Sequence, residues 1–145
     1  ITAPAENGIM GSRAMRQAME LASISPEQLG YISAHGTGTP LNDAAETKAI
    51  KVALGQRAYE VPVSSTKSMT GHMMGATGAV EAVFCVQTLR TGILPPTVNY
   101  HTPDPDCDLD YVPNTAREIQ VEAVISNAFG FGGHNAVIAL KRFHG

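Results

Sequence analysis

Two histidines stand in glycine- and threonine-rich loops, each after a short β-like stretch and before a helical pattern. Residues 31–40 read YISAHGTGTP and carry His35, whereas residues 64–72 read SSTKSMTGH and carry His72. Two loops that each lead from a strand into a helix can converge above one sheet, which would bring the imidazoles together. A pair of imidazoles held in this way suits acid–base chemistry or the stabilisation of a developing oxyanion.

Carboxylates at unusual positions accompany these loops. Glu81 lies within residues 75–89, a helical pattern that is apolar nearly all round. A buried carboxylate is costly unless it is paired, and Lys67, whose loop leads into this helix, is the expected partner. A structural ion pair and a catalytic one explain the two residues equally well. Asp43 and Glu46 lie on one face of the helix expected over residues 40–54. Three interpretations stay open for them: they join the cluster of Lys67 and Glu81, they bind a monovalent cation, or they face solvent.

A third segment, residues 126–135, reads SNAFGFGGHN and completes a set of three motifs. In this order, the three resemble the β-ketoacyl-acyl-carrier-protein synthases, the condensing enzymes of fatty-acid synthesis. The resemblance covers essentially the whole chain, and the second loop is more similar to type II fatty-acid enzymes than to polyketide synthases. It implies the C-terminal half of a thiolase-like fold, a layered α/β structure with a mixed sheet.

The same resemblance implies an activity and roles for individual residues. The reaction would be the decarboxylative Claisen condensation of an acyl thioester with malonyl-acyl carrier protein, without a metal or an organic cofactor. His35 and His72 would activate the malonyl group for decarboxylation and stabilise the enolate. Lys67 and Glu81 would support the active site by holding the histidine loop in place.

Substrate binding is expected from residues in two of the loops. Thr37 and Thr39 would hydrogen-bond the pantetheine arm of the substrate, although capping of the next helix also explains a threonine directly before Pro40. Phe129 and Phe131 lie in the Gly/Phe loop. The glycines around Phe131 permit motion, so Phe131 is expected to gate acyl-chain entry while Phe129 packs.

The resemblance also implies that the chain is part of a larger enzyme. The 145 residues suffice for one core, and we expect one C-terminal synthase domain, residues 1–145, without the N-terminal half that carries the cysteine nucleophile. Cys85 lies in an apolar helical pattern, which favours a buried, inert thiol, and Cys107 lies in an acidic loop. The expected partners are therefore the missing half, acyl carrier protein with acyl and malonyl groups, and a second copy in a homodimer.

Charge and hydropathy narrow the class of protein. A net charge of −3 gives no basic surface for nucleic acid, and no apolar run is long enough for a membrane span. Two cysteines without a disulfide or zinc pattern fit a reducing, cytoplasmic setting, or the plastid stroma in a plant.

Hydrophobic periodicity and breaker residues predict alternating helices and strands. Helices are expected over residues 8–22, 40–54 and 75–89, with another starting at Ser25-Pro26-Glu27. Strands are expected over residues 31–34, 61–65, 123–126 and 135–142, the last two as an antiparallel hairpin. An acidic, irregular connection is expected before the hairpin. One half-fold would leave a sheet or helix face uncovered.

Two other functions remain to be weighed. A non-catalytic chain-length-factor-like or interaction subunit fits the absence of a nucleophile segment, but such a subunit has no need of both histidines and Lys67. A metallohydrolase using His35, His72 and carboxylates would require a ligand cluster such as His-Glu-x-x-His, which the sequence lacks.

Overall fold

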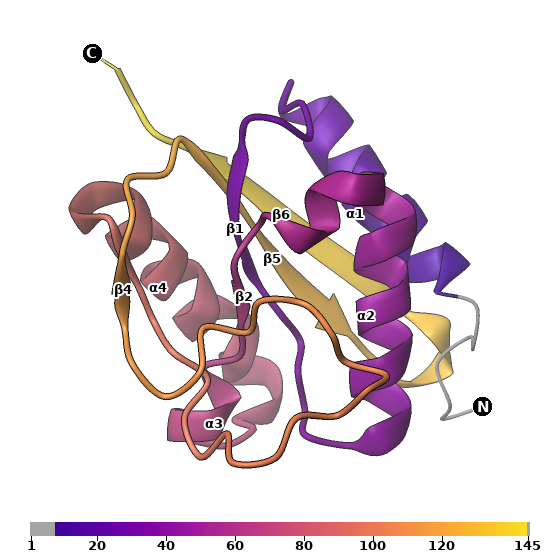
Figure 1. Ribbon diagram of the computed structural model, residues 1–145. Coiled ribbons are helices and arrows are strands. Elements are labelled where there is room, and N and C mark those ends of the chain that lie inside the picture. The colour runs from indigo at the N-terminus through magenta and orange to yellow at the C-terminus, as the bar shows by residue number, and fades with distance from the viewer. Residues whose placement is uncertain (1–7, 145) are drawn as a thin grey trace.

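The computed structural model describes residues 8–144, which form a four-stranded mixed sheet with helices on both faces (Figure 1). The strands follow the order β2-β1-β5-β6. Their bounds are Val63–Ser64, Leu29–Ser33, Ala123–Phe129 and Asn135–Lys141. β1 runs parallel to β2 and β5, whereas β5 and β6 form the predicted antiparallel hairpin.

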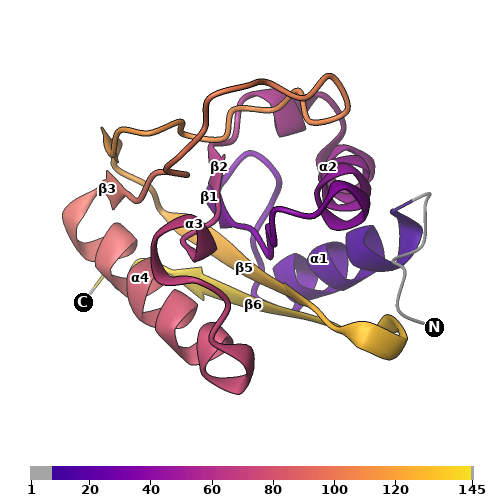
Figure 2. The same ribbon diagram turned by 90° about the horizontal axis from the view of Figure 1, so that it is seen from below.

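Helices cover both faces of the sheet, because successive side chains of each strand point to opposite faces and both sets are apolar. Helices α1 (Ile9–Leu21) and α2 (Pro40–Leu54) pack together on one face, and α4 (Thr77–Thr91) packs on the other (Figure 2). Neighbouring residues of a strand point to opposite faces. Ile32 therefore belongs to the core beneath α1 and α2, and Tyr31 to the core beneath α4.

Three predicted helices are confirmed, and their ends have local causes. Pro40 opens α2, and Gly55, with a φ of 60°, ends it, as Gly92 ends α4 with a φ of 74°. In these left-handed conformations glycine has no Cβ penalty. The predicted strands 31–34, 123–126 and 135–142 are confirmed within a few residues, while β2 is shorter than the predicted 61–65.

The helix predicted to start at Ser25-Pro26-Glu27 is wrong. The backbone N–H of Gln28 donates to the Ser25 carbonyl at 3.0 Å, and the Gln28 side-chain oxygen accepts from the Ser25 N–H at 2.9 Å. These bonds close a turn, and β1 begins at once at Leu29, so no length of chain remains for a helix. The same residues that cap helices also stabilise turns.

One face of α4 is exposed, as expected for a half-fold. Glu81, Cys85 and Thr88 are buried against the sheet, whereas Val83 is 58% exposed and Val86 is 44% exposed. A helix that is apolar nearly all round is usually buried between two layers. Within residues 8–144 only one side of α4 is covered.

The connection between α4 and β5 is irregular, as predicted, and contains a short antiparallel pair. β3 (Ile93–Leu94) pairs with β4 (Arg117–Glu118). The segment between them crosses the end of the sheet near α2 and α3 (Lys67–Thr70). Among the helices of the described chain, none has the length and hydropathy to cross a bilayer.

Candidate active site

The two predicted histidine loops meet at one edge of the sheet. β1 and β2 are parallel, with Ser33 opposite Ser64, so the segments that follow them leave the sheet side by side. The ring centroids of His35 and His72 lie 5.7 Å apart, with the rings nearly perpendicular at 86°. The predicted convergence of the imidazoles is therefore confirmed, and both rings can reach one small group.

His72 has a defined hydrogen-bonding arrangement. Its Nδ1 accepts a hydrogen bond from the backbone N–H of Met74 at 3.0 Å, and the Thr77 hydroxyl lies 3.4 Å from the same atom. A ring nitrogen that accepts an N–H bond carries no proton, so the neutral ring holds its proton on Nε2. His72 thus presents an Nε2–H donor, which suits an oxygen that gains negative charge.

His35 is held in its neutral form by its surroundings. Burial, reinforced by the positive charge of Lys67 and by His72, lowers the pKa of His35 from 6.5 to about 4. Its Nδ1 is buried and has no hydrogen-bond partner within the described residues. A neutral imidazole has one N–H to donate, so at neutral pH His35 can act as a hydrogen-bond donor rather than as a cation.

Glu46 fixes the backbone of the His35 loop. Its carboxylate accepts the N–H groups of His35 at 2.9 Å and Gly36 at 2.8 Å, and the Asn127 side-chain amide at 3.1 Å. Glu46 is only 4% exposed, so the solvated-face interpretation is wrong for it. Burial raises the pKa of Glu46, and these hydrogen bonds oppose the rise. Asp43 accepts from the N–H of Gly38 at 3.3 Å.

Lys67 and Glu81 form the predicted ion pair. Lys67 Nζ lies 2.5 Å from Glu81 Oε1, and the two side chains are 4% and 2% exposed. Burial raises the pKa of Glu81, while Lys67 acts in the opposite direction. The pair joins α3 to α4, the two elements that flank His72. The positive charge of Lys67 also lowers the pKa of His35.

Two oxygens are candidates to bind a monovalent cation, one of the alternatives left open for Asp43 and Glu46. Glu81 Oε2 and Asn127 Oδ1 are buried and lack a hydrogen-bond partner within residues 8–144. Both carboxylate oxygens of Glu46 already accept hydrogen bonds, from the N–H groups of His35 and Gly36 and from the Asn127 amide. No group of three or more His, Cys, Asp or Glu side chains in the described chain is arranged to hold a metal ion. A monovalent cation near Asp43, Glu46 and Glu81 remains an open alternative.

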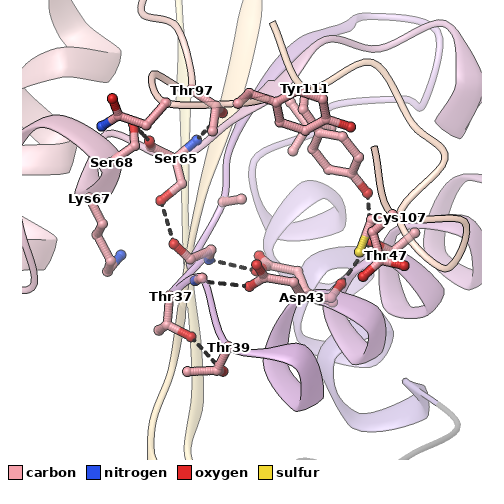
Figure 3. Close-up of a pocket in the computed structure, with 18 of the residues that line it drawn as sticks. Thr37, Thr39, Asp43, Thr47, Ser65, Lys67, Ser68, Thr97, Cys107 and Tyr111 are labelled. Carbon is pink, nitrogen blue, oxygen red and sulfur yellow. Dashed lines mark hydrogen bonds between the residues drawn. The ribbon is translucent and has the colours of Figure 1, made fainter. Parts of the chain in front are cut away.

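A pocket of about 720 Å³ extends from His72 toward α2. Figure 3 shows Lys67, Ser65 and Thr97 at one end and Thr47, Cys107 and Tyr111 at the other. Thr37 and Thr39 line the pocket, with their hydroxyls 2.9 Å apart. Thr39 stands at the start of α2, but in the described residues its hydroxyl makes no capping bond. The hydroxyls can therefore bind a ligand.

Two polar residues of this pocket, Tyr111 and Thr47, belong to no sequence motif. They join the irregular connection to α2 through hydroxyls 2.6 Å apart. Ser68, which lies within the second motif, accepts from the backbone N–H of Val98 at 3.0 Å. A single tyrosine in an irregular connection gives no periodic signal, so only the course of the chain reveals the contact of Tyr111.

The two phenylalanines differ in exposure. Phe129 ends β5 and packs against the core beneath α1, where its ring would lie 3.1 Å from a Cβ on Gly11. Phe131 is 77% exposed and precedes Gly132 and Gly133, whose φ values are 76° and 81°. The packing prediction for Phe129 is confirmed. The gate role of Phe131 stays a prediction.

Neither cysteine has the surroundings of a nucleophile. Cys85 is fully buried, as predicted, and burial raises its pKa to about 12. Burial also raises the pKa of Cys107. A reactive cysteine needs a stabilised thiolate, which both sites disfavour.

The mixed sheet and the paired histidine loops belong to the thiolase-like fold, the fold of solved ketosynthase structures. A ketosynthase solved with its type II polyketide acyl-carrier protein, bound to the hexaketide, matches with a TM-score of 0.96 and 40% identity. The match covers 99% of this chain and 35% of that one. A β-ketoacyl synthase from Burkholderia phymatum matches with a TM-score of 0.89 and 38% identity, over 99% and 34% of the two chains.

Sequence comparison identifies the family. Residues 1–101 match the family described as Beta-ketoacyl synthase, C-terminal domain, and the chain belongs to it. The 3-oxoacyl-[acyl-carrier-protein] synthase 2 of Synechocystis sp. is 51% identical over 143 residues, and that of Staphylococcus aureus strain COL is 52% identical over 143. Each alignment covers 99% of this chain and 34% of the relative. The chain thus spans about a third of the length of these relatives.

Proposed function

We propose that this chain supplies the histidine-bearing part of a condensing enzyme that elongates fatty acids. The reaction is the decarboxylative Claisen condensation of an acyl thioester with malonyl-acyl carrier protein. The edge-on contact of His35 and His72, at 5.7 Å, is the observation that carries the proposal. The relatives named 3-oxoacyl-[acyl-carrier-protein] synthase 2 support the substrate class.

Two imidazoles that act as hydrogen-bond donors suit the decarboxylation step. The thioester oxygen of the malonyl group accepts hydrogen bonds from His72 Nε2–H and from His35. The bond between the malonyl C2 and its carboxylate breaks, carbon dioxide leaves, and the electron pair forms an enolate whose oxygen the two donors stabilise. A cationic His35 is disfavoured by burial and by Lys67, so no proton is delivered to quench the carbanion.

The condensation step needs a part of the protein outside this chain. The enolate carbon attacks an acyl group carried as a cysteine thioester, the new carbon–carbon bond forms, and the thiolate leaves. Neither Cys85 nor Cys107 suits this role, because burial raises the pKa of both thiols. The part of the enzyme outside this chain, which corresponds to about two thirds of each relative, supplies the nucleophile. The complete enzyme acts as a homodimer in the cytoplasm.

The remaining residues serve binding and support. Thr37 and Thr39 hold the pantetheine arm of the acyl carrier protein in the pocket, and Phe131 gates entry of the acyl chain. A ketosynthase of 40% identity has been solved in complex with its acyl-carrier protein, which supports this partner. Lys67 and Glu81 hold the His72 loop, and Glu46 with Asp43 holds the His35 loop.

A chimera tests the proposal. This chain replaces the segment that it matches in the Synechocystis synthase, and the release of carbon dioxide from malonyl-acyl carrier protein is measured. His35→Ala and His72→Ala should each lower the rate by roughly a hundredfold or more, the usual cost of removing an oxyanion donor. His144→Ala, an exposed histidine that pairs with Glu122, is the matched control.

Two results would contradict the proposal. Normal decarboxylation in both site variants would show that the histidines do not act on the malonyl group. A folded but inactive parent chimera would favour the alternative, a non-catalytic subunit; a neighbour of 42% identity is described as a ketosynthase/chain length factor.

A further inference from the structure

Ser65 stands where three segments of the site meet. It follows β2 directly and is 7% exposed. Its hydroxyl donates to the carbonyl oxygen of Gly36 at 2.7 Å, and its backbone N–H donates to the Thr97 hydroxyl at 3.2 Å. Figure 3 shows Ser65 between Thr97 and the loop that carries Thr37. One residue therefore contacts the His35 loop and the irregular segment, and itself begins the loop of Lys67 and His72.

The hydrogen bond to Gly36 lies beyond the end of the sheet. The parallel ladder between β1 and β2 closes with the bond from Ala34 N–H to the Ser64 carbonyl at 2.9 Å. Past this point the two backbones separate into their loops. The next bond between the two loops is the one from the Ser65 hydroxyl to the Gly36 carbonyl. Gly36 directly follows His35, and Ser65 lies two residues before Lys67.

Gly36 is held from both sides. Its N–H donates to Glu46 at 2.8 Å, and its carbonyl accepts from Ser65. Its φ of 39° lies in the left-handed region, and a Cβ at this position would lie 2.5 Å from the Cβ of Ser65. Only glycine permits this approach, so the peptide after His35 is fixed by two side chains rather than by its own preference.

We propose that Ser65 is a positioning residue that sets the separation of His35 and His72, an inference that rests on the proposed function. Ser65 touches neither ring; it acts through the Gly36 carbonyl. An oxyanion donor is effective only within about 2.7–3.1 Å of the oxygen that it stabilises. A displacement of about 1 Å can cost roughly a hundredfold in rate, so the loss of one loop link has a measurable effect.

Decarboxylation by Ser65 variants of the chimera tests the assignment. Ser65→Ala should lower kcat about ten- to a hundredfold while KM for malonyl-acyl carrier protein stays the same, because the donors move but the pocket remains. Ser65→Cys keeps the volume with a much weaker donor, so it should resemble Ser65→Ala. A wild-type kcat for Ser65→Cys would overturn the proposal, since the hydrogen bond would then be dispensable.

Ser12→Ala is the control for stability alone. Ser12 is 2% exposed, and its hydroxyl donates to the backbone carbonyl of Ile9 at 2.8 Å within α1, so this bond links no loop of the site. It should lose thermal stability without a change in kcat. An equal loss of kcat in Ser12→Ala and Ser65→Ala would overturn the positioning role.

Crystal structures separate this inference from the proposed function. In Ser65→Ala the centroid separation of the two rings should depart from 5.7 Å, and an unchanged separation would overturn the proposal. This measurement needs no turnover. An inactive parent chimera would overturn the proposed function, while the crystallographic comparison would still decide whether Ser65 positions the rings.

Discussion

The buried ion pair of Lys67 and Glu81 gives a quantitative test of how the site is held together. Their side chains are 4% and 2% exposed, and Nζ lies 2.5 Å from Oε1. Removing one partner of a buried pair leaves a charge without compensation and costs about 3–5 kcal/mol. Replacing both with apolar residues of similar volume is often near neutral. Lys67→Met with Glu81→Leu should therefore cost less than the two single changes added together, by about 2 kcal/mol or more.

The pH dependence of the Lys67→Met variant has a defined sign. Burial already raises the pKa of Glu81 above its ordinary value of 4.5 with Lys67 present, and removal of Lys67 raises it further. The folded state then binds more protons than the unfolded state, so stability falls as pH rises from about 4.5 toward the folded pKa. The slope is at most about 1.4 kcal/mol per pH unit. Lys67→Met should be less destabilising at pH 5 than at pH 8.

Urea unfolding of the chimera and its variants measures both effects. The exposed pair Lys51 and Asp108, whose side chains are 30% and 45% exposed, is the control cycle and should show a far smaller coupling. If the losses of Lys67→Met and Glu81→Leu simply add, the two residues do not depend on each other. Glu81 would then need another partner, such as a cation at its free oxygen.

Three further predictions concern the other groups of the site. Phe129→Ala should lower stability, but by less than the about 3–5 kcal/mol of a fully buried ring, because Phe129 is partly buried. The exposed Phe131→Ala should change acyl loading with little loss of melting temperature. Equal melting temperatures and unchanged acyl transfer would contradict this distinction. In a nuclear magnetic resonance titration of labelled histidine, His35 should titrate near pH 4, well below 6.5, and a midpoint near 6.5 would refute its burial beside Lys67. The chain by itself should show no condensation, and activity abolished by Cys85→Ala or Cys107→Ala would reveal a nucleophile here.

Local chemistry made much of the fold predictable. Pro40 and Gly55 define α2 because proline suits the first turn and glycine adopts the conformation that ends a helix. Lys67 and Glu81 were paired correctly because a carboxylate in an apolar helix requires a cation, and a lysine preceded that helix. The failure at Ser25 has the same origin, since one local pattern serves both a helix start and a turn.

The environment of the histidines was beyond local inference. That both His35 and His72 stand after strands follows from the sequence. That they lie 5.7 Å apart depends on β1 pairing with β2 in one register, with Ser33 opposite Ser64. A strand pattern specifies which residues point inward, but not which strand lies beside it.

The sequence by itself determined the motifs, the element types and the need for a partner at Glu81, because these depend on neighbours along the chain. The tertiary structure decided how other polar groups are used. The sequence does not distinguish Glu46 from a solvated carboxylate, whereas the structure shows that its carboxylate accepts two N–H groups of the His35 loop. The Ser65 hydroxyl can donate to the Gly36 carbonyl only because the two loops follow adjacent strands, β1 and β2. Such contacts join residues far apart in sequence, and a buried polar group takes the partner that the fold brings to it.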